Sequence, residues 1–163
     1  MSDTSHTEGE AYVVDRTGWP AGPWDGEPDR LELREHGFPC LIVRSGMMGA
    51  LCGYVGVPPG HPYHGTHYGE IDGMVGCHGG LTYSDRCADH ICHIAQPGEP
   101  ADVWWLGFDC GHCFDFKPGQ EASIARYVGR AYRAGHNLES YKAVDYVRAE
   151  VSRLAEQLAE VMP

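Results

Sequence analysis

The stretch that decides the fold is residues 40–57, which read CLIVRSGMMGALCGYVGV. Two apolar runs, residues 40–43 and 50–57, flank a turn region at Gly46, and this pattern is typical of a β-hairpin. Residues 79–83 (GGLTY) and 103–108 (VWWLGF) read as two further strands. We therefore expect an antiparallel sheet in the middle of the chain.

The end of the chain has the periodicity of a helix. Apolar residues recur there at alternating spacings of three and four, which places one stripe along a helix of about 22 residues. Asn137 or Ser140 could cap its start. A shorter helix is expected at residues 121–133. The long stripe consists of Val144, Val147, Val151, Leu154, Leu158 and Val161, and the inward residues of the short helix are Ile124, Tyr127, Val128 and Ala131.

Together these elements predict an α+β fold. Residues 13–163 form a single domain, in which an antiparallel β-sheet carries a short and a long C-terminal helix packed on one face. The length of 163 residues suits one domain. Residues 1–12 are polar and acidic, so we expect a flexible acidic tail there.

The charge of the chain limits its partners. The net charge is −11, and residues 1–113 carry all of it, together with nine of the ten His and all seven Cys. Such a chain is a poor binder of bulk nucleic acid, because affinity for a polyanion comes from Lys and Arg. No apolar run approaches the roughly 20 residues of a membrane span, and the N-terminus lacks the pattern of a secretory signal. We expect a cytoplasmic protein without a membrane partner.

Four residues of the acidic region are candidate metal ligands. Asp109, His112 and Asp115 follow the strand at 103–108, and His78 opens the motif HGG at 78–80. Carboxylates with imidazoles suit a divalent metal such as Zn²⁺ or Mn²⁺, and His78 and His112 are also candidate catalytic groups. The alternative is structural: Asp109 caps a turn, His112 is an ordinary polar residue, and His78 opens a strand beside turn glycines.

A third candidate catalytic histidine lies in the loop at 58–76. The segment GHPYHGTH at 60–67 holds three histidines, of which His61 is favoured because Pro62 fixes the backbone beside it. His61 would act as a general acid or base, or gate a pocket. The alternative is an ordinary solvated loop histidine.

The cysteines offer a competing metal site. Cys87-x₄-Cys92 and Cys110-x₂-Cys113 approach the spacing of a structural zinc site. An odd number of cysteines without an export signal argues against a disulfide framework, so we expect reduced thiols. A two-cysteine redox function for Cys110 and Cys113 is disfavoured, because no helix clearly follows them.

A phosphate-bearing ligand has candidate contacts elsewhere. Arg126 and Arg130 lie on one face of the short helix and could meet phosphates. Tyr54, Tyr63, Trp104 and Trp105 could stack on a base. The alternative for the arginines is a solvated helix face.

Several motifs resemble a family of uncharacterised proteins of bacteriophages, mainly those of actinobacteria, and of some bacteria. The resemblance covers about residues 19–160 and rests on GPWDGEP at 22–28, CGYVGVP at 52–58, GHP at 60–62, HGGLT at 78–82 and WWLGFDCGH at 104–112. It implies a phage setting and supplies no reaction. Cys113 and Phe114 depart from the small polar residues of the family, which argues against Cys113 as a family zinc ligand.

Three functions follow from these observations. The first is a metal-dependent hydrolase of a small phosphate-containing, nucleotide-like molecule, in which a bound cation activates water. The second is a phage protein that sequesters a nucleotide signal or host factor without chemistry. The third is a structural or interaction protein with structural zinc, and possible homo-oligomers through the long helix. The phage setting suggests counter-defence for the first two.

Overall fold

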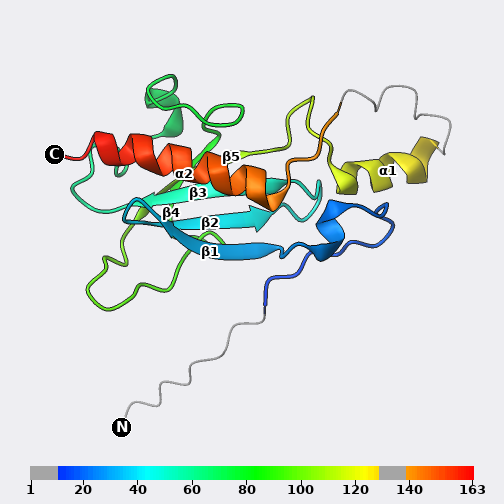
Figure 1. Cartoon of the computed structure of the whole chain (residues 1–163), viewed down its shortest axis with the longest axis horizontal. Coiled ribbons are helices and arrows are strands. Elements are labelled where there is room, and N and C mark those ends of the chain that lie inside the picture. Colours follow the sequence, from blue (N-terminus) through cyan, green and yellow to red (C-terminus); the bar gives the residue numbers. More distant parts are fainter. Residues whose placement is uncertain (1–10, 129–138) are drawn as a thin grey trace, which may run out of the picture.

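The computed structural model describes residues 11–128 and 139–163. Its centre is a five-stranded antiparallel sheet with the strand order β1-β2-β3-β5-β4 (Figure 1). The strands are β1 (Arg30–Glu35), β2 (Phe38–Arg44), β3 (Leu51–Val57), β4 (Tyr83–Arg86) and β5 (Trp104–Asp109). The helices are α1 (Pro118–Val128) and α2 (Val144–Glu160), with short 3₁₀ helices η1 (Pro23–Gly26) and η2 (Tyr68–Glu70). The predicted α+β class is confirmed.

The predicted hairpin forms the middle of the sheet. β2 and β3 pair with Arg44 opposite Leu51 and Cys40 opposite Val55. Nearly every residue of both strands is buried, because both faces of the sheet are covered. β1, with the charged sequence RLELRE, was not predicted, and the structure shows it as a half-buried strand.

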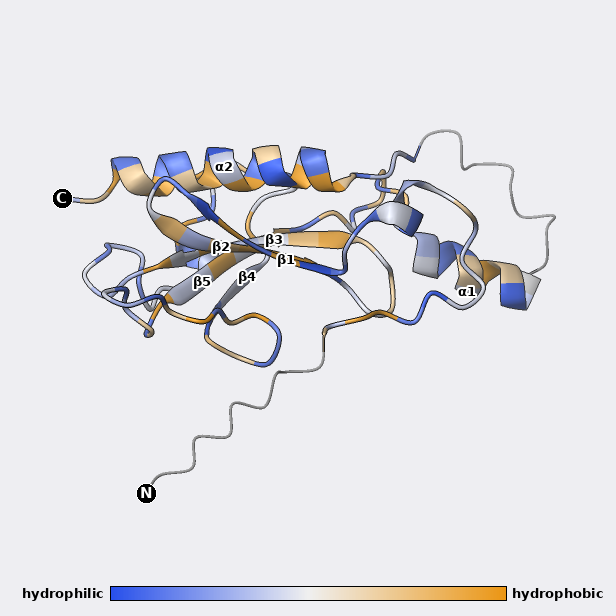
Figure 2. Ribbon diagram, turned by 60° about the horizontal axis from the view of Figure 1, so that its bottom comes forward, coloured by the Kyte–Doolittle hydropathy of each residue, from blue (hydrophilic) through white to orange (hydrophobic). Residues whose placement is uncertain are grey.

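One face of the sheet is covered by α2. In Figure 2 the apolar side of α2 faces the sheet and its hydrophilic side faces outward. The predicted stripe is correct at its centre, and Val161 lies just past the end of the helix, 36% exposed. The core on this side contains Ile42, Leu51, Val55, Leu106, Phe108, Val147, Val151, Leu154 and Leu158.

The start of α2 differs from the prediction. The N-cap is Ala143, which has no capping side chain, while the backbone N–H of Val144 donates to the Glu27 carboxylate at 3.1 Å. A partner 117 residues away therefore replaces the local cap that Ser140 would supply. Asn137 lies outside the described residues.

The short helix lies beyond the end of the sheet, beside η1 (Figure 1). It begins at Pro118, a favoured first residue, and its described part ends at Val128. Ile124 is half-buried, as expected, but Tyr127 is 84% exposed, which corrects its inward assignment. Ala131 lies outside the described residues.

Two other predicted boundaries change. Residues 79–82 are not strand: Gly79 and Gly80 have φ values of +69° and +82°, which bend the chain into a turn before β4. Tyr12, assigned to the tail, packs on the domain, since its hydroxyl donates to the Arg44 carbonyl at 2.8 Å. None of the described helices is long and apolar enough to span a membrane.

Candidate functional site

A group of polar side chains lies where β5 ends and α2 begins. We name it the polar cluster, and its members come from four segments: the turn at 77–80, the end of β5, the loop at 110–117 and the start of α2. They are His78, Asp109, His112, Asp115, Lys142 and Tyr146. The four predicted metal ligands thus lie in one region. Lys142 and Tyr146 were not predicted from the sequence.

The strongest contacts of the cluster are those of His78. Its Nε2 lies 2.8 Å from Asp115 Oδ2, and its Nδ1 lies 2.8 Å from the Tyr146 hydroxyl. An ionised carboxylate only accepts hydrogen bonds, so Nε2 carries the proton and donates it. In the neutral imidazole Nδ1 is then the acceptor, and Tyr146 donates to it. Asp115 therefore fixes which nitrogen of His78 can act as a base.

Asp115 is itself firmly held. It is 2% exposed, and its Oδ2 also accepts the backbone N–H of His112 at 3.0 Å. Its Oδ1 lies 3.6 Å from Lys142 Nζ. Burial alone would raise the pKa of the Asp115 carboxyl, but these hydrogen bonds and the nearby charges bring it below its ordinary value of 3.8. Asp115 is therefore an anion at neutral pH.

His112 packs against the glycine turn. A Cβ atom on Gly79 would lie 2.0 Å from His112 Nε2, so only glycine leaves room for this imidazole. Nε2 is covered, has no hydrogen-bond partner among the described residues, and lies 3.7 Å from Asp109 Oδ1. Gly79 of the HGG motif therefore makes room for the His112 ring.

Asp109 itself supports the turn, as its structural alternative proposed. Its Oδ1 accepts the Gly111 N–H at 2.9 Å, and its Oδ2 accepts the Thr82 hydroxyl at 2.8 Å. Lys117 ties the same loop together, because its Nζ donates to the carbonyl oxygens of His112 and Asp115. The carboxylates of Asp109 and Asp115 and the ammonium groups of Lys117 and Lys142 therefore give this region a formal charge of zero.

The polar cluster does not fit a resident metal ion as its side chains lie. Both nitrogens of His78 and both oxygens of Asp115 already face protein partners, and one of those partners is the Lys142 cation. Within residues 11–128 and 139–163, no group of three or more His, Cys, Asp or Glu side chains is placed to hold a metal. The Zn²⁺ or Mn²⁺ ion stays a prediction of the sequence.

His61 has a different place from the one expected. It is 4% exposed, its Nε2 lies 2.8 Å from the Leu158 carbonyl, and its Nδ1 accepts the Tyr63 N–H. Burial lowers its pKa. His61 contacts the C-terminal end of α2 while His78 contacts Tyr146 near its start, about 18 Å away along the helix. His61 therefore anchors the loop at 58–76 and lies far from the polar cluster.

The four aromatic residues proposed to stack on a base do not form one surface. Neighbouring residues of a strand point to opposite faces, so Trp104 and Trp105 are separated by the sheet. Trp105 and Tyr54 belong to the face opposite α2, while Trp104 and Tyr63 pack on the α2 side. Trp105 is fully buried, and the Trp104 indole N–H donates to the Thr66 carbonyl.

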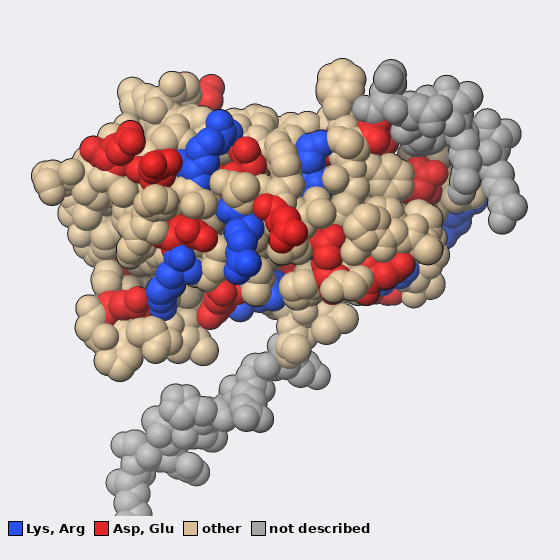
Figure 3. All heavy atoms as spheres, viewed as in Figure 1, with Lys and Arg blue, Asp and Glu red and all other residues tan. Residues whose placement is uncertain are grey.

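The proposed phosphate contacts on the short helix receive no support. Arg126 is exposed on α1, and Arg130 lies outside the described residues. Figure 3 shows basic and acidic side chains interspersed on the face that α2 covers, without a continuous basic surface on that face.

The cysteine predictions are wrong in one respect. Cys87 and Cys92 form a disulfide, with Cα atoms 4.7 Å apart. Backbone hydrogen bonds between Ala88 and Ile91 close the loop and bring the two sulfurs together. A zinc site with all four predicted cysteines is excluded by this bond. Cys110 is buried and Cys113 exposed, both free, and burial raises the pKa of the Cys110 thiol.

Fold and site define the class of the protein: a five-stranded antiparallel sheet, covered on one face by one long helix, with a buried aspartate that contacts a half-buried histidine near the end of β5. Comparisons with protein-family models, curated proteins and solved structures give no match to the chain.

Proposed function

We propose that the protein is a hydrolase of a small phosphate-containing, nucleotide-like molecule, with His78 as its general base and acid. The observation that carries the proposal is the chain of contacts Asp115–His78–Tyr146. A buried carboxylate that orients an imidazole is a common arrangement for proton transfer, and such catalysis contributes about 10²-fold to 10⁴-fold in rate.

The residues have distinct roles in this proposal. Asp115 holds the proton on His78 Nε2 and stabilises the imidazolium that forms when Nδ1 takes a proton. The Tyr146 hydroxyl, which is on a residue that is 39% exposed, would pass its own proton to Nδ1 while it takes one from a water molecule. Lys142, whose Nζ lies 3.6 Å from Asp115 Oδ1, would turn from this carboxylate toward a phosphate and supply positive charge to it.

A metal ion is not part of this mechanism, because the donor atoms are already engaged. The sequence-based version with Zn²⁺ or Mn²⁺ is tested by elemental analysis of protein purified without a His tag. A stoichiometric metal in the purified protein would contradict the metal-free version.

The central experiment is incubation with a panel of nucleotides, followed by chromatography of the ligand. We expect wild-type protein to convert at least one nucleotide, His78→Ala to lose at least about 10²-fold in rate, and Lys142→Met to raise KM. His67→Ala, which removes an exposed histidine elsewhere, is the matched control. Turnover that is unchanged in His78→Ala would contradict the proposal.

The same assay separates the hydrolase from its rivals. A bound nucleotide that emerges unchanged would favour sequestration without chemistry. The absence of binding would favour a structural or interaction protein. Phage counter-defence, the cytoplasmic location and homo-oligomers stay predictions, and the disulfide is unusual for a reducing compartment.

A further inference from the structure

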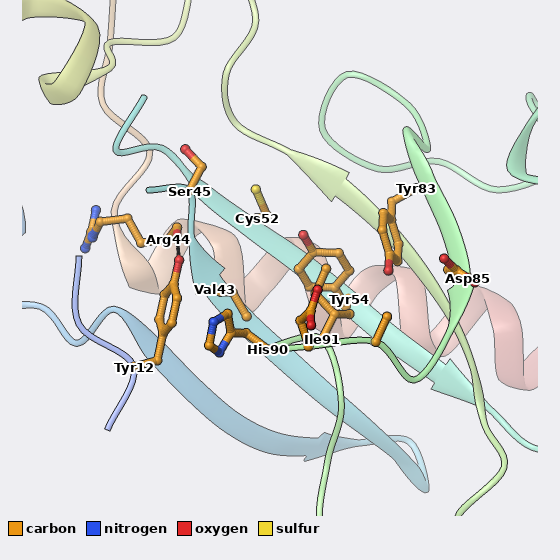
Figure 4. Close-up of a pocket in the computed structure, with 12 residues that line it drawn as sticks. Tyr12, Val43, Arg44, Ser45, Cys52, Tyr54, Tyr83, Asp85, His90 and Ile91 are labelled. Carbon is orange, nitrogen blue, oxygen red and sulfur yellow. Dashed lines mark hydrogen bonds between the residues drawn. The ribbon is translucent and has the colours of Figure 1, made fainter. Parts of the chain in front are cut away.

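A second site lies on the face of the sheet opposite α2. It is a cavity of about 450 Å³, a size common for small-molecule sites (Figure 4). We name it the tyrosine pocket, after three tyrosines that come from the N-terminal segment, β3 and β4. The residues that matter to its chemistry are Tyr12, Tyr54, Tyr83, Asp85, Asp89 and His90.

The aromatic wall of the pocket follows from the register of the sheet. Tyr54 on β3 and Tyr83 on β4 both pair with Gly107 on β5, which lies between them. A Cβ atom on Gly107 would lie 2.3 Å from the Tyr54 ring, so glycine is needed at this position. The two tyrosine rings therefore meet edge to face across Gly107, with centroids 5.2 Å apart.

The disulfide loop forms the opposite wall. Residues 87–92 carry Asp89 and His90, and the His90 ring lies 4.3 Å from that of Tyr12. The bond between Cys87 and Cys92 holds this short loop closed. Sheet and loop thus present aromatic rings to the same space (Figure 4).

The charge of the lining is negative. Asp85 and Asp89 are both exposed carboxylates. Among the described lining residues the basic one is Arg44, whose Nε lies 2.7 Å from Asp29 and whose Nη2 lies 3.7 Å from Glu27. Its guanidinium points away from Tyr54 and Tyr83 in Figure 4. The pocket therefore disfavours a phosphate, unlike the polar cluster.

We propose that the tyrosine pocket binds a small organic cation, with its apolar part against the tyrosine rings and its ammonium group toward Asp85 and Asp89. The tyrosine rings offer an apolar surface for the body of the ligand, and the two carboxylates attract its ammonium group by their charge. The proposal is independent of the hydrolase, because none of its residues belongs to the polar cluster.

The test uses three probes with one ring system and different charge: tryptamine (a cation), tryptophol (neutral) and indole-3-acetate (an anion). Isothermal titration calorimetry of the full chain should give the lowest Kd for tryptamine and the highest for indole-3-acetate. Added salt should reduce the difference. Tryptamine that binds no tighter than indole-3-acetate, or no binding by any probe at millimolar concentration, would overturn the proposal.

Variants locate the site. Asp85→Asn and Asp89→Asn should each weaken tryptamine about twofold to fivefold and leave tryptophol unchanged. Glu156→Gln, an exposed position on α2, removes the same charge elsewhere and should change neither. Tyr83→Ala should weaken both probes about threefold to tenfold, while Tyr127→Ala on α1 should not. Equal effects of Asp85→Asn and Glu156→Gln would show that the cation binds outside this pocket and would overturn the proposal.

Discussion

The polar cluster and the tyrosine pocket are built in opposite ways. In the polar cluster a buried carboxylate, Asp115, accepts hydrogen bonds from a turn and a loop, and its charge is paired with Lys142. In the tyrosine pocket the two carboxylates are exposed and the contacts are mainly those of rings. Substitutions in the polar cluster should therefore lower the free energy of unfolding. Substitutions of the exposed carboxylates of the tyrosine pocket should leave it nearly unchanged.

The largest expected effect is that of Asp115→Ala. It leaves the His78 Nε2–H and the His112 N–H without their acceptor and Lys142 without its counter-charge, so the free energy of unfolding should fall by about 3 kcal/mol. Urea denaturation followed by circular dichroism measures this loss. A loss below about 1 kcal/mol would mean that the cluster does not stabilise the fold.

The pH dependence of stability tests the same carboxylate. Because the pKa of folded Asp115 lies below its ordinary value of 3.8, the unfolded chain takes up this proton first as the pH falls. The contribution is complete above about pH 5 and is lost as the pH falls through the lowered pKa. Asp115→Asn should flatten the fall in stability between about pH 5 and pH 3, and Asp85→Asn should not. Equal slopes in wild type and Asp115→Asn would contradict the assignment.

Gly79→Ala and Gly80→Ala form a matched pair with an intermediate effect. Both glycines have positive φ, so each substitution should cost about 1 kcal/mol from backbone strain. At Gly79 the new methyl also meets the His112 ring, whereas at Gly80 the nearest atom is 3.8 Å away. The extra loss in Gly79→Ala, with a shift of the His112 imidazole signals by NMR, measures the contact. Equal losses would show that the ring moves aside freely.

The smallest effect is expected at the rim of the tyrosine pocket. Asp85→Asn should change the free energy of unfolding by less than about 0.5 kcal/mol, because the side chain is exposed. Thermal unfolding at matched pH measures it. A loss as large as that of Asp115→Ala would show that both sites contribute equally to the stability of the fold.

The sequence predicted the centre of the fold and part of the site. The apolar runs of β2, β3 and β5 and the stripe of α2 have a clear period, and the HGG and FDCGH motifs marked His78 and His112. β1 was missed although its sequence RLELRE alternates charged and apolar residues, which is the period of a strand with one exposed face. Tyr146 and Lys142 were missed because their partners, His78 and Asp115, are distant in sequence. Their position at the start of the predicted long helix was the one feature of the sequence that could have suggested them.

By itself, then, the sequence determined the α+β class, the hairpin and the apolar face of the long helix, because periodicity is a local property that the chain shows directly. Only the tertiary structure decided that His61 anchors a loop, that Trp104 and Trp105 lie on opposite faces, that Cys87 pairs with Cys92, and that Glu27 caps α2. These facts depend on register and on contacts between distant segments. The tyrosine pocket is of the same kind, since Gly107 joins Tyr54 and Tyr83 only once three strands are paired.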